Sequence, residues 1–525
     1  MKIEVLSVFS SSEFFSFSSL KNSYTVTHTL VYVGMTTAAM RTVFFSSPLT
    51  TMKTRQPNKS RGKITLAVVV YVKEETKKKK KRKVGVKSSF ASSSREVDKN
   101  DDCFVVRHSV SSSAKKETLS SESSKLLLLK NVSIAIKDNI DVRGLKTGCG
   151  NPDFLRDFSP KAKTENAPLV EHLLREGGQI VGKTHMDELA WSLQGENYHY
   201  GTPRNGRALG RIPGGSSSGS ASAVSRGLAD LAVGTDTAGY VRVPASFCGV
   251  YSIRMTHDFD ERMCHEGIVP LAKSFDVPGF FANDLEMLLR ATKALVLKAF
   301  PDNTNNAEEE SFNTNSDDDR IIKDVVKFVK LEDAFALATD EVRGAIDTYL
   351  EKNGIEYETV KLEENQNILE WWEDFRVQQT DDVWKAHGEW IRKRNPKFGP
   401  GVHERFYGAE EVSEDTKNVE RAREMNRKRA EIIRNEVFRG RKSKTICIVP
   451  AAACAPPKLN EDASVVNDLR VKTLSLSSIS GLTGLPEVVV PCVSNKNELP
   501  IGVGFIGWER KCDVALLQTL LEKRL

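Results

Sequence analysis

Apolar and polar residues follow the periods of short strands and amphipathic helices from about Leu126 onward. In residues 167–176, for example, the apolar residues recur at helical spacing, and two glycines then end the segment as in a helix C-cap. The pattern predicts strands at 132–136, 179–181, 325–329, 446–449, 487–490 and 502–506, and helices at 167–176, 186–193, 286–296, 340–353, 413–438, 474–479 and 513–521. Helices that alternate with short strands predict an α/β fold with a mixed sheet.

Residues 212–245 interrupt this pattern with two glycine-rich loops on either side of a short helix of small residues. The first loop reads GGSSSGS from Gly214, and the second reads GTDTAGYVR from Gly234. Glycines at this density let backbone N–H groups approach a ligand closely, and successive N–H groups form a concave nest for an anion or an oxyanion. Because the serines of the first loop can relay protons, we expect this stretch to hold the functional site.

Residues 1–123 differ in composition from the rest of the chain. They are rich in Ser, Thr and Lys, and residues 1–100 hold 19 Lys and Arg against 6 Asp and Glu. A basic, acid-poor, serine-rich leader is typical of a plastid or mitochondrial transit peptide, although a disordered extension or an artefact of gene prediction explains it equally well. We predict a disordered leader over 1–123 and a folded domain over 124–525, with a flexible acidic insertion at 301–320.

Charge and cysteine content limit the classes of partner. The chain carries a net charge of +6, but the part after residue 100 is acidic, with 57 Lys and Arg against 64 Asp and Glu, so nucleic-acid binding is not indicated. The eight cysteines form no CxxC pair, which predicts no zinc site. The apolar stretches 29–40 and 64–72 are too short to span a bilayer. The basic run Lys77–Lys83 is either a weak nuclear-import signal or, more commonly, a solvated tail, and the expected compartment is the cytoplasm or a plastid.

Two later segments have a structural and a functional interpretation. Residues 366–392 carry four tryptophans, which either pack along the buried face of a helix or line an apolar pocket for an acyl group. Packing is the simpler interpretation. Residues 413–438 form a charged helix whose arginines lie beside glutamates, so we interpret it as a solvated cover helix rather than a nucleic-acid surface.

The two glycine-rich loops, their spacing and the VRVPASFCG run after them resemble the amidase signature of Ser–Ser–Lys amide hydrolases. The resemblance implies a mixed, twisted β-sheet covered by helices on both faces, and hydrolysis of small carboxamides without a metal or other cofactor. It assigns the general base to Lys137 and the relay serine to Ser216, in a cis peptide with the residue before it. A lysine at the end of a buried strand is desolvated, which lowers its pKa and suits it to act as a base.

Tyr240 departs from the family pattern. The family places its nucleophilic serine 24 residues after the relay serine, and this chain has Tyr240 there. A phenol oxygen lies at the far end of a rigid ring, so it misses the position of a serine oxygen, and the ring fills space meant for the acyl group. A misplacement of about 1 Å can cost roughly a hundredfold in rate. The neighbouring hydroxyl of Ser217 has the wrong spacing to replace it.

The oxyanion hole is the other part of the site that the resemblance implies. It assigns the donors to the backbone N–H groups of Thr237, Ala238 and Gly239, with Gly215 and Ser217 beside the substrate. Ala238 replaces a glycine that is usual in the family, and its Cβ is costly if the backbone needs a positive φ there.

The residues around the second loop are expected to hold its shape. Asp236 and Arg242 flank the loop, and we expect them to pair because the planar guanidinium group matches a carboxylate. The family's G-x-[KR]-P run is degraded over residues 251–258, which lack its proline and following glycine. The family's S-x-D element returns within residues 268–284, where Ser274 and Asp276 are expected to be structural.

These observations leave two functions open for the resembling region, residues 126–525, beside a third hypothesis, which is a non-functional or mispredicted gene product and which the unusual N-terminus fits. The first is an amidase, with most likeness to plant enzymes that hydrolyse indole-3-acetamide in auxin biosynthesis, whose turnover Tyr240 weakens or removes. The second is a pseudoenzyme, a catalytically inactive binding or scaffold protein similar to the amidase-like receptors of the chloroplast outer envelope. The expected partner is a small carboxamide, as substrate or as ligand, and a homodimer is compatible with either function.

Overall fold

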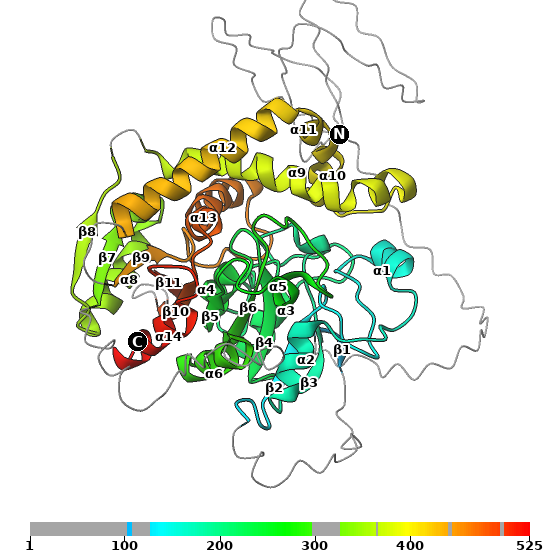
Figure 1. Ribbon diagram of the computed structural model, residues 1–525, viewed down its shortest axis with the longest axis horizontal. Helices are drawn as coiled ribbons and strands as arrows, with labels where there is room; N and C mark the ends of the chain where they lie inside the picture. The colour runs from blue at the N-terminus through cyan, green and yellow to red at the C-terminus, as the bar shows by residue number, and fades with distance from the viewer. Residues whose placement is uncertain (1–101, 108–126, 297–325, 364–365, 439–443, 494–497) are drawn as a thin grey trace, which may run out of the picture. The chain divides into compact units, whose positions relative to one another are not determined.

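The structure, a computed structural model, describes residues 102–107, 127–296, 326–363, 366–438, 444–493 and 498–525 (Figure 1). These residues all belong to a compact unit that spans Ser94–Leu525. The acidic insertion predicted at 301–320, the basic run Lys77–Lys83 and most of the predicted leader lie outside the described residues. No helix of the described part is long and apolar enough to cross a membrane.

An 11-stranded mixed sheet forms the centre of the fold. In sheet order its strands are β1 (Phe104–Arg107), β3 (Gln179–Thr184), β2 (Ser133–Lys137), β4 (Leu231–Asp236), β6 (Val277–Ala282), β5 (Tyr251–Arg254), β10 (Glu487–Val493), β11 (Pro500–Ile506), β9 (Thr445–Pro450), β7 (Lys327–Leu331) and β8 (Tyr357–Val360). The strand β2 is parallel to β3 and to β4, and β7 is parallel to β8 and to β9, whereas the other pairs are antiparallel.

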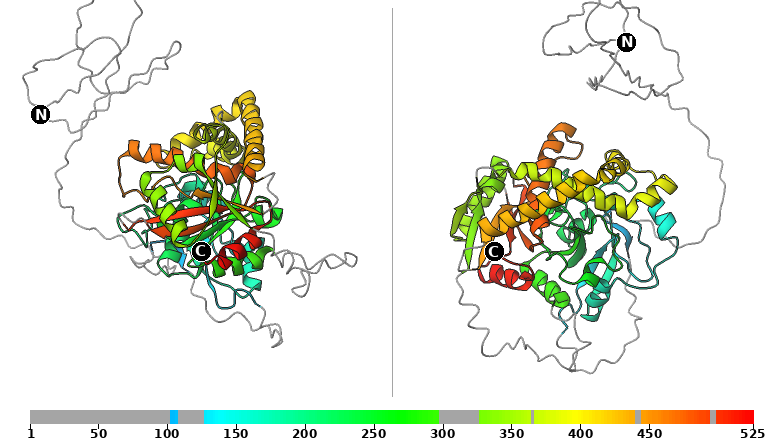
Figure 2. Two further views of the ribbon diagram at one scale, coloured as in Figure 1. Left: turned by 90° about the vertical axis from the view of Figure 1, so that its left-hand side faces the viewer. Right: turned by 45° about the horizontal axis from the view of Figure 1, so that its top comes forward.

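Helices cover both faces of the sheet (Figure 2). They are α1 (Pro152–Phe158), α2 (Pro168–Arg175), α3 (Ser218–Ser225), α4 (Arg242–Cys248), α5 (Glu261–His265), α6 (Leu285–Val296), α7 (Glu332–Ala336), α8 (Asp340–Lys352), α9 (Ile368–Arg394), α10 (Val402–Tyr407), α11 (Ala409–Glu414), α12 (Thr416–Ile433), α13 (Ala463–Thr483) and α14 (Asp513–Glu522). The predicted α/β class, with helices on both faces of a mixed sheet, is therefore confirmed.

The alternation of side chains along β2 explains how the two faces differ. Ile134 and Ile136 point to the face that packs against α2 and α6, where large aliphatic side chains form the core. Ala135, between them, points to the opposite face, where the small residues of α3 and α4 pack. Small side chains on this second face let α3 approach β2 and β4 closely, and α3 begins directly after Ser217. The sheet thus brings the end of β2 next to the two glycine-rich loops.

The helices α9, α11, α12 and α13 form a further layer that contains the longest helices of the fold (Figure 1). The helix predicted over 413–438 is split, because α11 ends at Glu414 and α12 then runs from Thr416 to Ile433 before the short π-helix η4 (Arg434–Phe438). The cover-helix interpretation agrees with the packing of α12 on α9 and α13.

Two predictions from the sequence are wrong. Residues 186–193 form no α-helix but only the 3-10 turn η2 (Glu188–Ala190), because Leu189 and Ala190 have positive φ angles.

The segment assigned to a disordered leader contains β1, which pairs with β3 and buries Phe104, so the boundary at residue 123 is too late.

Candidate active site

Lys137, the last residue of β2, lies at the centre of the candidate site. Its Nζ donates hydrogen bonds to Ser216 Oγ and to Thr235 Oγ1, both at 2.9 Å, and a longer one of 3.4 Å to the carbonyl of Thr235. Lys137 and Ser216 have no exposed surface. The parallel pairing of β2 with β4 explains the contact with Thr235, because both residues lie at the carboxyl ends of adjacent strands.

Burial gives Lys137 the protonation behaviour of a base near neutral pH. It lowers the pKa of Lys137 from 10.5 to about 7, although three nearby carboxylates favour the charged form. Asp187 contributes most among these carboxylates, and burial raises its own pKa to about 6. Asp187 was not among the predicted site residues, because no motif in the sequence marks it.

The first glycine-rich loop positions Ser216 against Lys137. The peptide bond between Gly215 and Ser216 is cis, as the resemblance implies. The Oδ2 of Asp187 accepts a hydrogen bond from Gly195 N, and a Cβ on Gly215 would lie only 2.3 Å from this same oxygen. Glycine is therefore the only residue that fits at position 215 without moving Asp187.

The second loop is held by a buried ion-pair network around Asp236. The expected pair is present, with Arg242 Nη2 at 2.9 Å from Asp236 Oδ1. Arg254, from the degraded segment 251–258, makes a second pair at 3.2 Å and also donates to the carbonyl of Asp236. Burial acts to raise the pKa of Asp236, but the two guanidinium groups outweigh it and hold that pKa well below its usual value. Arg254 therefore helps to hold the second loop, although the family motif around it is altered.

Only two of the three expected oxyanion donors have a free N–H group. Gly239 N donates to Asp236 Oδ1 at 2.9 Å. The N–H groups of Thr237 and Ala238 have no acceptor among the described residues. Ala238 does not have a positive φ, so the strain considered for its Cβ is absent, whereas Gly239 has a φ of 95°. A Cβ on Gly239 would also lie 2.2 Å from Ser477 Oγ of α13, so only glycine fits there.

Tyr240 is buried in a hydrophobic cluster, and polar groups of Gln379, Arg405 and Arg470 also act on its phenol. Its side chain is 1% exposed and belongs to the same buried cluster as Trp372 and Phe375 of α9. Burial raises the pKa of Tyr240 to about 12, and the positive charges of Arg470 and Arg405 act in the opposite direction without outweighing it. The phenol is therefore neutral near pH 7, and no hydrogen bond joins it to Ser216 among the described residues.

Ser217 does not contact the lysine. Its Oγ donates to the carbonyl of Thr235 at 3.3 Å and accepts from Thr235 N at 3.4 Å. Its backbone N–H donates to the carbonyl of Tyr240 at 3.3 Å, which ties the two loops together. The hydroxyl of Ser217 thus serves the junction between β4 and the first loop, and no base is next to it.

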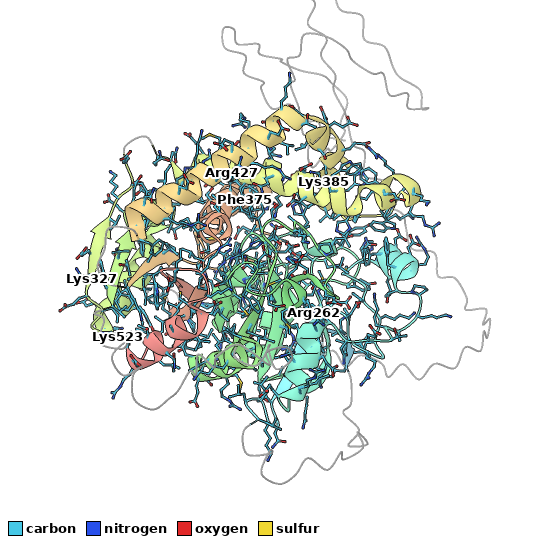
Figure 3. All side chains as sticks on the ribbon, in the orientation of Figure 1. Arg262, Lys327, Phe375, Lys385, Arg427 and Lys523 are labelled. Carbon is cyan, nitrogen blue, oxygen red and sulfur yellow. The ribbon has the colours of Figure 1, made fainter. Side chains whose placement is uncertain are left out.

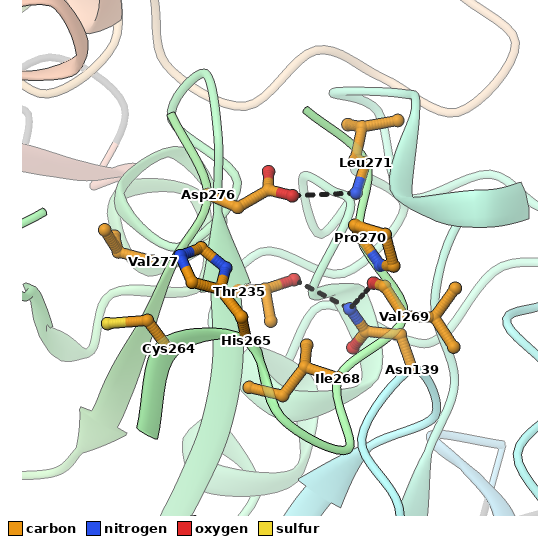
Figure 4. A pocket seen from close by; sticks show the side chains of 10 residues that line it. All are labelled: Asn139, Thr235, Cys264, His265, Ile268, Val269, Pro270, Leu271, Asp276 and Val277. Carbon is orange, nitrogen blue, oxygen red and sulfur yellow. Dashed lines mark hydrogen bonds between the residues drawn. The ribbon is translucent and has the colours of Figure 1, made fainter. Parts of the chain in front are cut away.

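A small cavity is lined by Thr235, which accepts a hydrogen bond from Lys137, and by residues that include Asn139 and Asp276 (Figure 4). Its volume of about 10 Å³ suits a single water molecule and not a carboxamide. Asp276 accepts hydrogen bonds from the N–H groups of Leu271 and Ala272 and from Thr237 Oγ1. The structural role expected for Asp276 is therefore to anchor the start of the second loop.

The tryptophans of α9 are buried. They are Trp371, Trp372, Trp384 and Trp390. Trp372 stacks on Phe375 with 5.6 Å between ring centroids, and Phe375, which is labelled in Figure 3, stacks on Phe275 at 4.1 Å. This arrangement confirms packing as the interpretation of the aromatic cluster.

Comparison with known proteins identifies the family. The amidase family model matches residues 86–517. The protein named Amidase 1 from Arabidopsis thaliana is 34% identical over 406 residues, which cover 74% of this chain and 91% of that protein. This chain belongs to the amidase family. The resemblance on which the site assignment rests is thus confirmed at the level of the family.

Two further comparisons extend this result. The pea (Pisum sativum) protein named Translocon at the outer membrane of chloroplasts 64 is 30% identical over 75% of this amidase-family chain and 65% of its own length. A solved complex, described as a vestigial protein complex that reveals the origins of an s-triazine catabolic enzyme, contains a chain with the same fold. It has a TM-score of 0.66 and 24% identity over 81% of this chain and 92% of that one.

Proposed function

We propose that this chain is an amidase-family pseudoenzyme, in which the acyl-transfer step on small carboxamides is blocked at Tyr240. One observation carries the proposal: the Tyr240 phenol is buried against α9, whereas the buried Lys137–Ser216 pair is intact. The proton relay therefore ends at Ser216, whose Oγ is bonded to Lys137 and to no further hydroxyl among the described residues.

The chemistry of acyl transfer explains why the side chain at position 240 is decisive. Neutral Lys137 would take the proton of Ser216 Oγ, and Ser216 would take a proton from the nucleophile. The nucleophile would form an ester with the acyl carbon as the C–N bond breaks. The proton taken up by Lys137 would return through Ser216 to the leaving nitrogen, so that ammonia leaves before water hydrolyses the ester. A neutral phenol with a pKa of about 12, which makes no hydrogen bond to Ser216 among the described residues, cannot begin this sequence.

A small aromatic carboxamide is the ligand class that we propose. The likeness to Amidase 1 of Arabidopsis thaliana and the aromatic residues around Tyr240 support it. Removing the phenol ring from position 240 would open space in this aromatic cluster. We take indole-3-acetamide as the test compound because it combines a primary carboxamide with an aromatic ring.

Hydrolysis of indole-3-acetamide by the full chain tests the proposal. We expect the parent to release no acid above background and Tyr240→Ser to release it catalytically. The matched control is Tyr240→Ala, which removes the ring without adding a hydroxyl and should stay inactive. Turnover by the parent protein, or equal turnover by the alanine variant, would contradict the proposal because the missing hydroxyl would not be the cause.

A second candidate function is a binding or scaffold role at the plastid outer envelope. The observation that favours it is the 30% identity to the pea translocon protein. A fluorescent fusion of the full chain tests this candidate, since it requires signal at the plastid envelope. Signal confined to the cytoplasm or the nucleus would reject it and leave the pseudoenzyme proposal unaffected.

A further inference from the structure

A polar groove of about 490 Å³ lies away from the Lys137–Ser216 pair, between α12, the end of α13 and two loops that follow β5 and β11. Its lining includes Arg423 and Arg427 of α12, Arg434 of η4, and Arg510 from the loop after β11. Glu431 is the only carboxylate among the lining residues of this groove. We call this feature the arginine groove.

The arginines of the groove come from two parts of the chain. Arg423, Arg427 and Arg434 are four and seven residues apart, so they form one stripe along α12 and its continuation. Arg427 is labelled on α12 in Figure 3. Arg510 follows β11, and His257 follows β5. Positive groups from separate segments that line one groove can bind the same anion.

Two of the four arginines pair with carboxylates. Arg423 pairs with Asp381 and Asp382, and Arg427 pairs with Glu424. Arg434 donates a hydrogen bond to the carbonyl of Thr483.

Arg510 forms no ion pair with any carboxylate of the described residues. Burial, together with Arg254 and Arg510, lowers the pKa of His257 to about 4, which agrees with a positive potential near Arg510. A bound anion would supply a counter-charge for Arg510.

Asn426 adds a second, independent feature that points to a ligand. Its side chain is 4% exposed and lines the groove, and its Oδ1 has no hydrogen-bond partner within the part of the chain that the structure describes. The Nδ2 of the same amide is satisfied by the carbonyl of Asp374 and by Gln378 Oε1, which fixes the orientation of the amide. A buried acceptor without a donor is costly, so this oxygen fits a hydroxyl group of a ligand.

We propose that the arginine groove binds a small phosphate ester that carries hydroxyl groups, such as a sugar phosphate. The arginines would hold the phosphate groups, and Asn426 Oδ1 would accept a hydrogen bond from a hydroxyl of the sugar. The groove volume lies within the range of about 300–1,000 Å³ that is typical of small-molecule sites. The groove shares no residue with the Lys137–Ser216 pair or with Tyr240, so this binding is independent of the proposed function.

Calorimetric titration of the full chain tests this proposal, with fructose 1,6-bisphosphate, inorganic pyrophosphate and fructose as probes. We expect saturable binding of the sugar bisphosphate at one site, weaker binding of pyrophosphate and none of fructose. Arg510→Gln should weaken binding of the bisphosphate at least about tenfold, because a charge-assisted contact is lost. Lys428→Gln is the matched control, since it removes a positive charge from α12 outside the groove and should leave the affinity unchanged.

Three results would overturn the proposal: no saturable binding of the bisphosphate, equal affinity in the parent and in Arg510→Gln, or pyrophosphate binding as tight as that of the bisphosphate. The last would mean that the groove takes a bare anion. Arg510 is exposed, so its substitution leaves the core intact. A second measurement needs no variant: hydrogen exchange of α12 in the parent protein, compared with and without the bisphosphate. Unchanged exchange there would also count against the proposal.

Discussion

The Nζ of Lys137 and the Oγ of Ser216 lie 2.9 Å apart in the interior of the protein, and neither side chain has exposed surface. A lysine is costly to bury as a cation, and here burial lowers its pKa to about 7. The pair therefore keeps the geometry and protonation of an acid–base relay, even though the next position in that relay is occupied by Tyr240.

The pH dependence of a restored enzyme should report this lysine directly. We predict that kcat/KM of Tyr240→Ser rises with pH as Lys137 loses its proton, with half of the maximum near pH 7. An unshifted lysine, with a pKa of 10.5, would instead place the rise above pH 9. The measurement is a pH–rate profile from pH 5 to 10, with Lys137→Ala in the same background as the inactive control. A flat profile between pH 6 and 8 would contradict the assignment.

The Asp236 network should carry a large share of local stability. We predict that Asp236→Ala lowers the free energy of unfolding by about 3–5 kcal/mol, because it leaves Arg242 and Arg254 buried without their shared carboxylate. The matched control is Asp340→Ala, which breaks the exposed pair with Arg343 and should cost less than about 1 kcal/mol. Urea unfolding of both variants measures the difference, and a similar small loss in both would refute the network's importance.

Much of the fold could be predicted from the sequence because local patterns determine it. Alternation along β2 and the helical spacing of α2 are visible without any tertiary information. The turn at 188–190 could not be predicted from local patterns. Packing imposes the positive φ angles of Leu189 and Ala190 and overrides the apolar spacing that suggested a helix. β1 was missed because four residues within a basic, polar stretch form a strand only when they pair with β3.

The candidate site was predictable as far as its motifs reach. Lys137, Ser216 and the ion pair between Asp236 and Arg242 follow from the signature and the chemistry of its residues. The roles of Asp187 and Arg254 arise from contacts between distant segments, which the order of residues does not reveal. The N–H group of Gly239 was predicted to donate to an oxyanion, but it already donates to the carboxylate of Asp236.

The position of β1 leads to a prediction about truncation. A chain that begins at residue 124 lacks β1, which leaves an edge of β3 unpaired and removes the carbonyl of Cys103 that accepts from His185 N. We expect it to unfold at a lower temperature than a chain that begins at Ser94 and keeps β1. Thermal unfolding followed by circular dichroism compares the two. Equal melting temperatures would show that β1 adds no stability.

Covalent labelling of the nucleophile position tests whether Tyr240 silences the site. An alkyl fluorophosphonate reacts with an activated serine hydroxyl, and intact-mass spectrometry counts the adducts on the full chain. We expect no adduct on the parent protein and a single adduct at position 240 of Tyr240→Ser, whose formation requires Lys137. An adduct on the parent, mapped to Ser216 or Ser217, would show that a nucleophile survives and that Tyr240 does not silence the site.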